Sequence, residues 1–132
     1  MPQALTSGLV LNNDGSSRFL HIDVANVGDE CRTLTLEVID WGNSFFDSPT
    51  GPVGFLLNPV KDEYPPNTAK EFNVIVPYPT HYEVRLIASD HDEIDEDIVI
   101  TSAVAVAAAT GWEEGYTQFT KLYKKIQVKK LK

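Results

Sequence analysis

The densest group of chemically useful side chains is the acidic run at residues 90–97, which holds six carboxylates in eight positions. Hard cations such as Ca²⁺ take about six to eight oxygen ligands, so this run offers enough carboxylates for part of such a shell. Its spacing differs from an EF-hand loop, because Ile94 and Asp95 stand where that loop needs an oxygen ligand and a glycine. Two interpretations stay open: a Ca²⁺-binding loop, or a solvated connection between strands.

The other residue types that support catalysis do not form a known pattern. The three histidines are His21, His81 and His91, and none has a Cys or His at zinc-site spacing or lies in an H-E-x-x-H motif. The chain contains no glycine-rich phosphate loop and no G-x-S-x-G nucleophile motif. We therefore expect a protein that is not an enzyme and needs no cofactor. We assign no catalytic, cofactor-binding or metal-ligating residue.

Charge is distributed very unevenly along the chain. All nineteen acidic residues precede residue 115, whereas six of the eleven Lys and Arg residues lie in the last twelve positions. Residues 1–116 hold the other five basic residues and carry a net charge of −14, while residues 117–132 carry +6. A lysine tail attracts phosphates, but the acidic body repels the same polyanions, so we expect no nucleic-acid partner. The remaining partner for the tail is the acidic run, in its own subunit or in a neighbour.

Alternation of apolar and polar residues predicts β-strands along most of the chain. The clearest predicted strands are residues 19–25, 33–38, 71–76 and 82–88. Shorter candidates are residues 8–12, 53–58, 98–108 and 117–128, of which the last reads as a bent strand or a helix. Turn signals rich in Asn, Gly and Pro separate them, including Gly111, and residues 48–66 read as a long irregular connection with one short strand. This pattern predicts an all-β fold, an immunoglobulin-like or jelly-roll β-sandwich of seven or eight strands with extended termini.

Length and composition predict one domain over residues 1–132, with a basic strand or tail at about residues 117–132. Cys31 is the only cysteine and cannot form an internal disulfide, so the fold must depend on packing. The N-terminus lacks the basic and apolar regions of a signal peptide, and no apolar stretch approaches the ~20 residues of a membrane span. We expect synthesis in the cytoplasm and no membrane span, with the final location, including a cell or spore surface, left open.

Trp41 and Tyr82 are two aromatic residues that the sandwich prediction can explain in two ways. Trp41 ends a predicted strand and Tyr82 begins another. The placement is similar to that in immunoglobulin-like domains, where a Trp of strand C packs between the sheets and a Tyr near the start of strand F bonds back to the backbone. The chain lacks the cysteine pair of antibody domains, so the alternative is that both are simply core aromatics.

Four segments together resemble a family: Thr6 to Asn13, Asn26-Val27-Gly28, Pro65 to Ala69, and Tyr82 to Arg85. They are similar to the small leaderless all-β proteins of spore-forming Bacillota described as exosporium or spore-surface proteins. The resemblance covers residues 6–90 and implies a structural or surface role without catalytic residues. The acidic run and the lysine tail lie outside it.

Two functional classes follow. We expect a non-catalytic structural subunit that self-assembles through its termini by head-to-tail contacts, which build rings or open filaments, into a surface filament or layer. The alternative is a β-sandwich binding module for Ca²⁺, a carbohydrate or a protein partner. Trp112 with Tyr116, or Phe45 with Phe46, on one open face would favour binding, and their burial against a neighbouring subunit would favour assembly.

Overall fold

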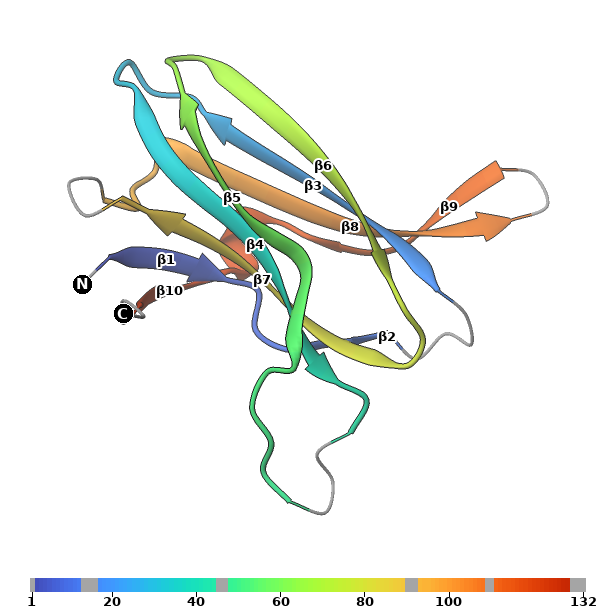
Figure 1. The fold of residues 1–132 in the computed structure, drawn as a ribbon. Helices are drawn as coiled ribbons and strands as arrows, with labels where there is room; N and C mark the ends of the chain where they lie inside the picture. The colour runs from blue at the N-terminus through green and yellow to red at the C-terminus, as the bar shows by residue number, and fades with distance from the viewer. Residues whose placement is uncertain (1, 13–16, 45–47, 90–92, 109–110, 129–132) are drawn as a thin grey trace.

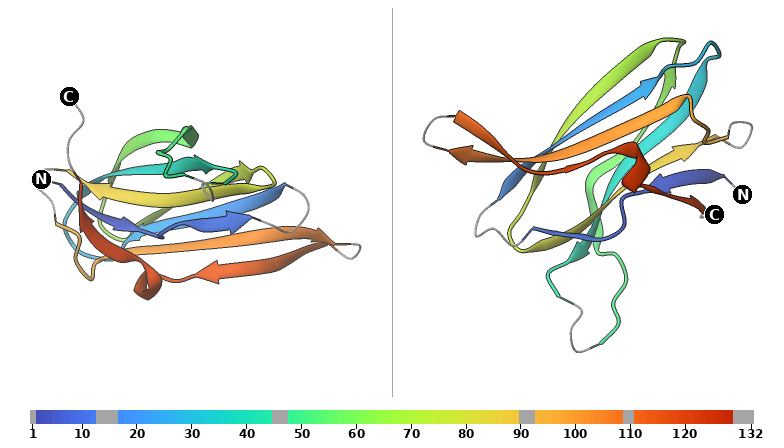
Figure 2. Two further views of the ribbon diagram at one scale, coloured as in Figure 1. Left: turned by 90° about the horizontal axis from the view of Figure 1, so that it is seen from below. Right: turned by 180° about the vertical axis from the view of Figure 1, so that it is seen from behind.

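The protein is a sandwich of two antiparallel β-sheets (Figures 1 and 2), which confirms the predicted fold class. The computed structural model describes residues 2–12, 17–44, 48–89, 93–108 and 111–128, with residues 105–108 and 111–116 described by their backbone alone. Within these ranges there are more strands than the predicted seven or eight. They are β1 (Gln3–Thr6), β2 (Val10–Asn12), β3 (Arg18–Asn26), β4 (Arg32–Gly42), β5 (Gly54–Tyr64), β6 (Thr68–Val76), β7 (Thr80–Ala88), β8 (Ile98–Ala108), β9 (Gly111–Gln118) and β10 (Lys124–Gln127), with a 3₁₀ turn, η1 (Thr120–Leu122).

The two sheets differ in size and in the strands that they combine. The six-stranded sheet has the order β10-β1-β7-β4-β5, and β2 also pairs with β7. The four-stranded sheet has the order β6-β3-β8-β9. The first and last strands lie side by side at one edge, with Ala4 opposite Ile126. Most connections cross from one sheet to the other, so each sheet is assembled from segments far apart in the sequence.

The core lies between the sheets and is built from alternate residues of each strand. Leu20, Ile22 and Val24 of β3 are fully buried, and Leu36 and Val38 of β4 face them from the other sheet with no exposed area. Burying a side chain of this size stabilises the fold by about 1.5–3 kcal/mol before entropy is subtracted. The clearest predicted strands therefore bury the faces that alternation indicated.

The N-terminal strand was predicted at residues 8–12, and the structure differs there. Two short strands, β1 and β2, run along β7, with Leu5 opposite Leu86 and Val10 opposite Tyr82. Gly8 separates them with a φ of +73°, a conformation that glycine adopts without steric cost. Because β1 has only four residues, alternation within it was too short to be recognised.

The segment at residues 48–66 was predicted to be largely irregular, but β5 occupies most of it as an eleven-residue strand. β5 is an edge strand, and edge positions tolerate a proline because one side of the strand has no hydrogen-bonding partner. Asn58 and Pro59 form a bulge between the pairs Val60–Leu36 and Leu57–Val38. The proline interrupts the ladder locally without ending the strand.

The C-terminal segment was predicted as one bent strand over residues 117–128, and this was wrong. β9 begins at Gly111, which was predicted to be a turn residue, and the η1 turn separates β9 from β10. The turn moves the chain from the four-stranded sheet to the six-stranded sheet and places Tyr123 in the core at 7% exposure. The Tyr123 hydroxyl lies 2.7 Å from Ser102 Oγ.

We predict that Tyr123→Ala lowers the free energy of unfolding by about 3–5 kcal/mol, because it removes a large aromatic from the core. Leu122→Ala is the matched control, since the neighbouring side chain is 53% exposed; we expect a change within about 0.5 kcal/mol. Urea unfolding followed by far-UV circular dichroism measures both. Equal effects of the two substitutions would show that the C-terminal segment does not close the core.

Candidate functional site

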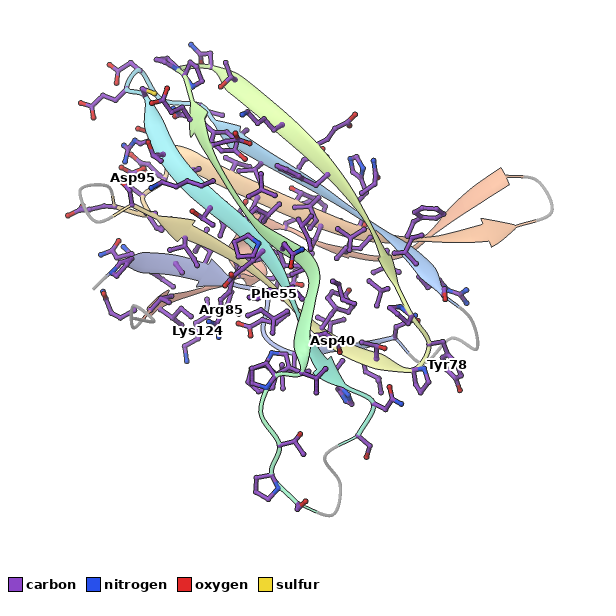
Figure 3. All side chains as sticks on the ribbon, viewed as in Figure 1. Asp40, Phe55, Tyr78, Arg85, Asp95 and Lys124 are labelled. Atoms are coloured by element: carbon purple, nitrogen blue, oxygen red, sulfur yellow. The ribbon has the colours of Figure 1, made fainter. Side chains whose placement is uncertain are left out.

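The outer face of the six-stranded sheet carries a groove of about 890 Å³. Ile39 of β4 and Ile87 of β7 line it centrally, Ile126 of β10 lines it on one side, and Phe55 of β5 lines it on the other. β5 and β7, which carry Phe55 and Arg85, flank β4 (Figure 3). The groove is therefore largely apolar although it lies on the face turned away from the core.

Trp41 also lines the groove, so it lies in neither of the two core placements that the sequence suggested. It is half-buried on the outer face, since the outward positions of β4 are Thr35, Glu37, Ile39 and Trp41. For Trp41, the inter-sheet position of the immunoglobulin-like interpretation and the alternative of a simple core aromatic are therefore both wrong. Tyr82, in contrast, is 3% exposed and belongs to the core.

Glu83 anchors a polar network on this face. Its carboxylate accepts hydrogen bonds from the Thr6 hydroxyl, from Trp41 Nε1 at 3.0 Å and from Arg85 Nε at 2.8 Å. Burial alone would raise the pKa of Glu83, but the hydrogen bonds from Arg85, Thr6 and Trp41, with the charge of Arg85, lower it. Both carboxylate oxygens are occupied, so Glu83 holds the groove together and stays ionised.

Glu37 lines the groove next to this network and lacks such partners. It is 8% exposed and stands opposite Arg85 in the β4–β7 register. Within the part of the chain that the structure describes, no hydrogen bond or ion pair reaches its carboxyl, and Arg85 acts on it only through a longer electrostatic interaction. Burial raises the pKa of Glu37 against the influence of Arg85. An apolar groove with one unpartnered acid at its centre can bind a molecule that offers a hydrogen bond to that acid.

The described part of the acidic run is folded against an arginine. Asp95 Oδ2 lies 2.7 Å and Asp97 Oδ2 lies 3.7 Å from Arg32 Nη2. Burial acts to raise the pKa of Asp95, but the hydrogen bonds from Arg32 and from the Asp97 amide lower it, with the charges of Arg32 and Lys125 adding to the effect. Two carboxylates offered for Ca²⁺ are thus already paired with a cation. Asp90, His91 and Asp92 lie outside the described residues.

The basic tail pairs with the first strand of its own subunit. β10 pairs with β1 of the same chain, and the Val128 amide donates to the Pro2 carbonyl at 2.8 Å. Lys125 is close enough to Asp95 to influence the pKa of that carboxyl. The intramolecular alternative for the tail therefore has structural support over residues 124–128.

A second cluster lies on the outer face of the four-stranded sheet. His21, Asp23 and Glu71 each direct one potential ligand atom toward the others, and these atoms lie within 4.8 Å of one another. The hydrogen bond with Asn73 raises the pKa of His21 against burial, and the charges of Asp23 and Glu71 raise it further. From the sequence, His21 was considered for zinc-site spacing and was assigned no role. Its His-x-Asp spacing was the available signal, because residues two apart share a strand face.

Comparisons with known proteins add no assignment. No family model matches the chain, and no curated protein or solved structure is significantly similar to it. The resemblance of residues 6–90 to spore-surface proteins therefore stays a prediction.

Among the described segments there is no helix long and apolar enough to cross a membrane. Phe45 and Phe46, and the side chains of Trp112 and Tyr116, lie outside what the structure describes.

Glu37→Gln and Glu83→Gln should change stability in opposite directions at pH 7. The raised pKa of Glu37 means that folding loses stability as the pH rises above about 4.5, the unfolded value, through the folded pKa. Glu37→Gln removes that cost, so we expect it to be more stable than the wild type at pH 7, with the difference vanishing below about pH 4.

The lowered pKa of Glu83 has the opposite sign, since its contribution is present above about pH 4.5 and is lost as the pH falls through the folded value. We expect Glu83→Gln to lower the free energy of unfolding at pH 7 by at least about 1.5 kcal/mol, the contribution of one charge-assisted hydrogen bond. Urea unfolding at pH 4 and pH 7 tests both substitutions. A destabilising effect of Glu37→Gln at pH 7 would contradict this account of the groove.

Proposed function

We propose that this protein is a non-catalytic binding module whose groove takes a small, largely apolar molecule carrying a hydrogen-bond donor, such as an amine or a hydroxyl group. The observation that carries this proposal is Glu37, a residue that is 8% exposed overall, lines the groove and has no hydrogen bond to its carboxyl within the described residues. Burial raises the pKa of this carboxyl, so the groove disfavours its ionised form. A bound donor would offset part of that cost.

The size and walls of the groove fit a ligand of this kind. Pockets for small molecules have volumes of roughly 300–1,000 Å³, apolar walls and a few placed polar groups. The groove has about 890 Å³, and its walls include Ile39, Trp41, Phe55, Ile87 and Ile126. Contact with these side chains would contribute roughly 25 cal/mol for each Å² of apolar surface removed from water. The walls supply affinity, and Glu37 orients the ligand.

The charges in the groove favour a donor over an anion. Arg85 is already bound to both oxygens of Glu83, at 2.8 and 3.3 Å. Among the described residues no Lys or Arg contacts the Glu37 carboxyl directly, although Lys61 also lines the groove. Glu37 would repel an anionic group placed beside it, whereas an N–H or O–H group satisfies its carboxyl.

The same network argues against catalysis. Two carboxyls whose pKa values are moved in opposite directions resemble an acid–base pair. Glu83, however, has both oxygens occupied by Thr6, Trp41 and Arg85, so it has no lone pair directed at a substrate. Of these two acids only Glu37 remains open to a bound molecule, so the pair does not supply both an acid and a base.

Self-assembly through the termini stays a prediction for this chain. The strand expected to reach a neighbouring sheet, β10, is paired with β1 of its own subunit. Pro2, Gln127 and Val128 of the terminal segments also line the groove, so a second copy seated there is the competing occupant. The oligomeric state therefore belongs in the test.

N-phenyl-1-naphthylamine is a suitable probe because it joins a large apolar body to one N–H donor. We expect saturable binding to the full chain, seen as a rise in probe fluorescence, and about tenfold weaker binding to Phe55→Ser, which removes an apolar wall. Glu37→Leu, which keeps the groove apolar but deletes the acceptor, should also weaken binding.

Ile75→Ser is the matched control for Phe55→Ser, because Ile75 is an exposed apolar residue of the opposite sheet. It should bind the probe as the wild type does. Equal affinity of the two serine variants would refute the groove as the binding site. Light scattering gives the oligomeric state with and without the probe. A dimer that does not bind the probe and does not dissociate in its presence would also refute the proposal, since a second copy would then occupy the groove.

A further inference from the structure

We propose that the outer face of the four-stranded sheet carries a Zn²⁺ site formed by His21, Asp23 and Glu71. The site lies on the opposite sheet from the groove and uses none of the residues that line it. The two proposals therefore stand or fall separately.

The backbone positions the three side chains on one rigid surface. His21 and Asp23 lie two residues apart on β3 and share its outward face, while Leu20, Ile22 and Val24 fill the core below. In the β3–β6 register, Asp23 stands opposite Glu71 and His21 stands opposite Asn73. Two adjacent cross-strand pairs of β3 and β6 thus bring the histidine, the aspartate and the glutamate together.

The distances between the ligand atoms suit a metal ion. His21 Nε2 lies 2.9 Å from Asp23 Oδ1 and 3.6 Å from Glu71 Oε2. Zinc bonds to nitrogen and oxygen are about 2.0–2.2 Å long, so neighbouring ligands of a tetrahedral ion lie about 3.4 Å apart. The two distances lie on either side of that value, and the third separation, between the Asp23 and Glu71 oxygens, is within 4.8 Å.

Asn73 orients the imidazole for metal binding. His21 Nδ1 lies 2.9 Å from Asn73 Oδ1, and because a carbonyl oxygen only accepts, Nδ1 carries the proton of this hydrogen bond. The lone pair of the neutral ring is then on Nε2, which faces the two carboxylates. Histidines that bind metals usually donate their other ring N–H to an oxygen in this way.

The negative charges of Asp23 and Glu71 also favour the binding of a cation. Asp23 and Glu71 are like charges directly opposite each other on paired strands, an arrangement that destabilises a sheet. In the ranges that the structure covers, His21 is the basic side chain that contacts both carboxylates, and no Lys or Arg forms an ion pair with either. Lys70, the nearest lysine in sequence, extends to Asp62 at 3.3 Å. A divalent ion between the carboxylates would replace repulsion with attraction.

The combination of one nitrogen and two oxygen ligands favours Zn²⁺ over Ca²⁺. One imidazole nitrogen with two carboxylate oxygens suits Zn²⁺, whereas Ca²⁺ requires about six to eight oxygens. Three protein ligands leave one tetrahedral position, and because Asp23 and Glu71 are more than half exposed, that position is open to water.

Isothermal titration of the full chain with ZnCl₂ tests the site, with all variants made in a Cys31→Ser background because the exposed thiol is itself a zinc ligand. We expect one Zn²⁺ per chain, at least tenfold weaker binding to His21→Gln, Asp23→Asn and Glu71→Gln, and an increase in melting temperature on saturation that these variants lose. Asn73→Ala should weaken binding by about 10–100-fold while keeping all three ligands.

His81→Gln is the control, since His81 Nδ1 lies 3.1 Å from the Gly42 carbonyl, on the other sheet. It should bind Zn²⁺ as the parent does, and CaCl₂ should give no heat of binding. The inference is overturned if the parent binds no Zn²⁺, if the three ligand variants and His81→Gln bind it equally, or if Ca²⁺ binds in its place. The ligands are on the surface, so unchanged circular dichroism spectra separate lost ligation from lost folding.

Discussion

Alternation of side chains across a strand is the constraint on which this structure depends. β3 and β4 turn Leu20, Ile22, Leu36 and Val38 inward, and the apolar layer between the sheets holds the domain together without a disulfide. The same geometry sends every intervening residue outward. The groove and the His21 cluster occupy those outward faces, so both sites follow from the alternation that builds the core.

The outer face of the six-stranded sheet bears two acids whose pKa values are moved in opposite directions. Burial raises the pKa of Glu37, whereas a set of hydrogen bonds lowers that of Glu83. The two acids lie on neighbouring strands in the same low-dielectric surroundings, and they differ because only Glu83 receives donors. Keeping Glu37 ionised in this position is costly to the fold, whereas the donors around Glu83 offset the cost of burying that carboxylate.

Some of the acidic and basic residues that lie far apart in the sequence are close together in the structure. Arg32 holds Asp95 and Asp97, Lys125 adds its charge near Asp95, and β10 completes the sheet beside β1. The Gln3 side chain accepts a hydrogen bond from the Ile94 amide, which connects the acidic segment to the first strand. The first and last strands, β1 and β10, are thereby connected to each other, and β1 is connected to the acidic segment through Gln3.

The sequence by itself determined the all-β class and the buried faces of the long strands, because a period of two is a local property that short stretches such as Phe19–Ala25 display. It also determined the charge asymmetry. Only the tertiary structure decided where β1 ends and β10 begins, that β5 continues through Pro59 at a sheet edge, and that Trp41 faces outward. It alone paired Glu37 with Arg85 and Asp23 with Glu71, since these partners are far apart in the chain. Strand pairing follows from how the whole core packs, and no local pattern records which strands become neighbours.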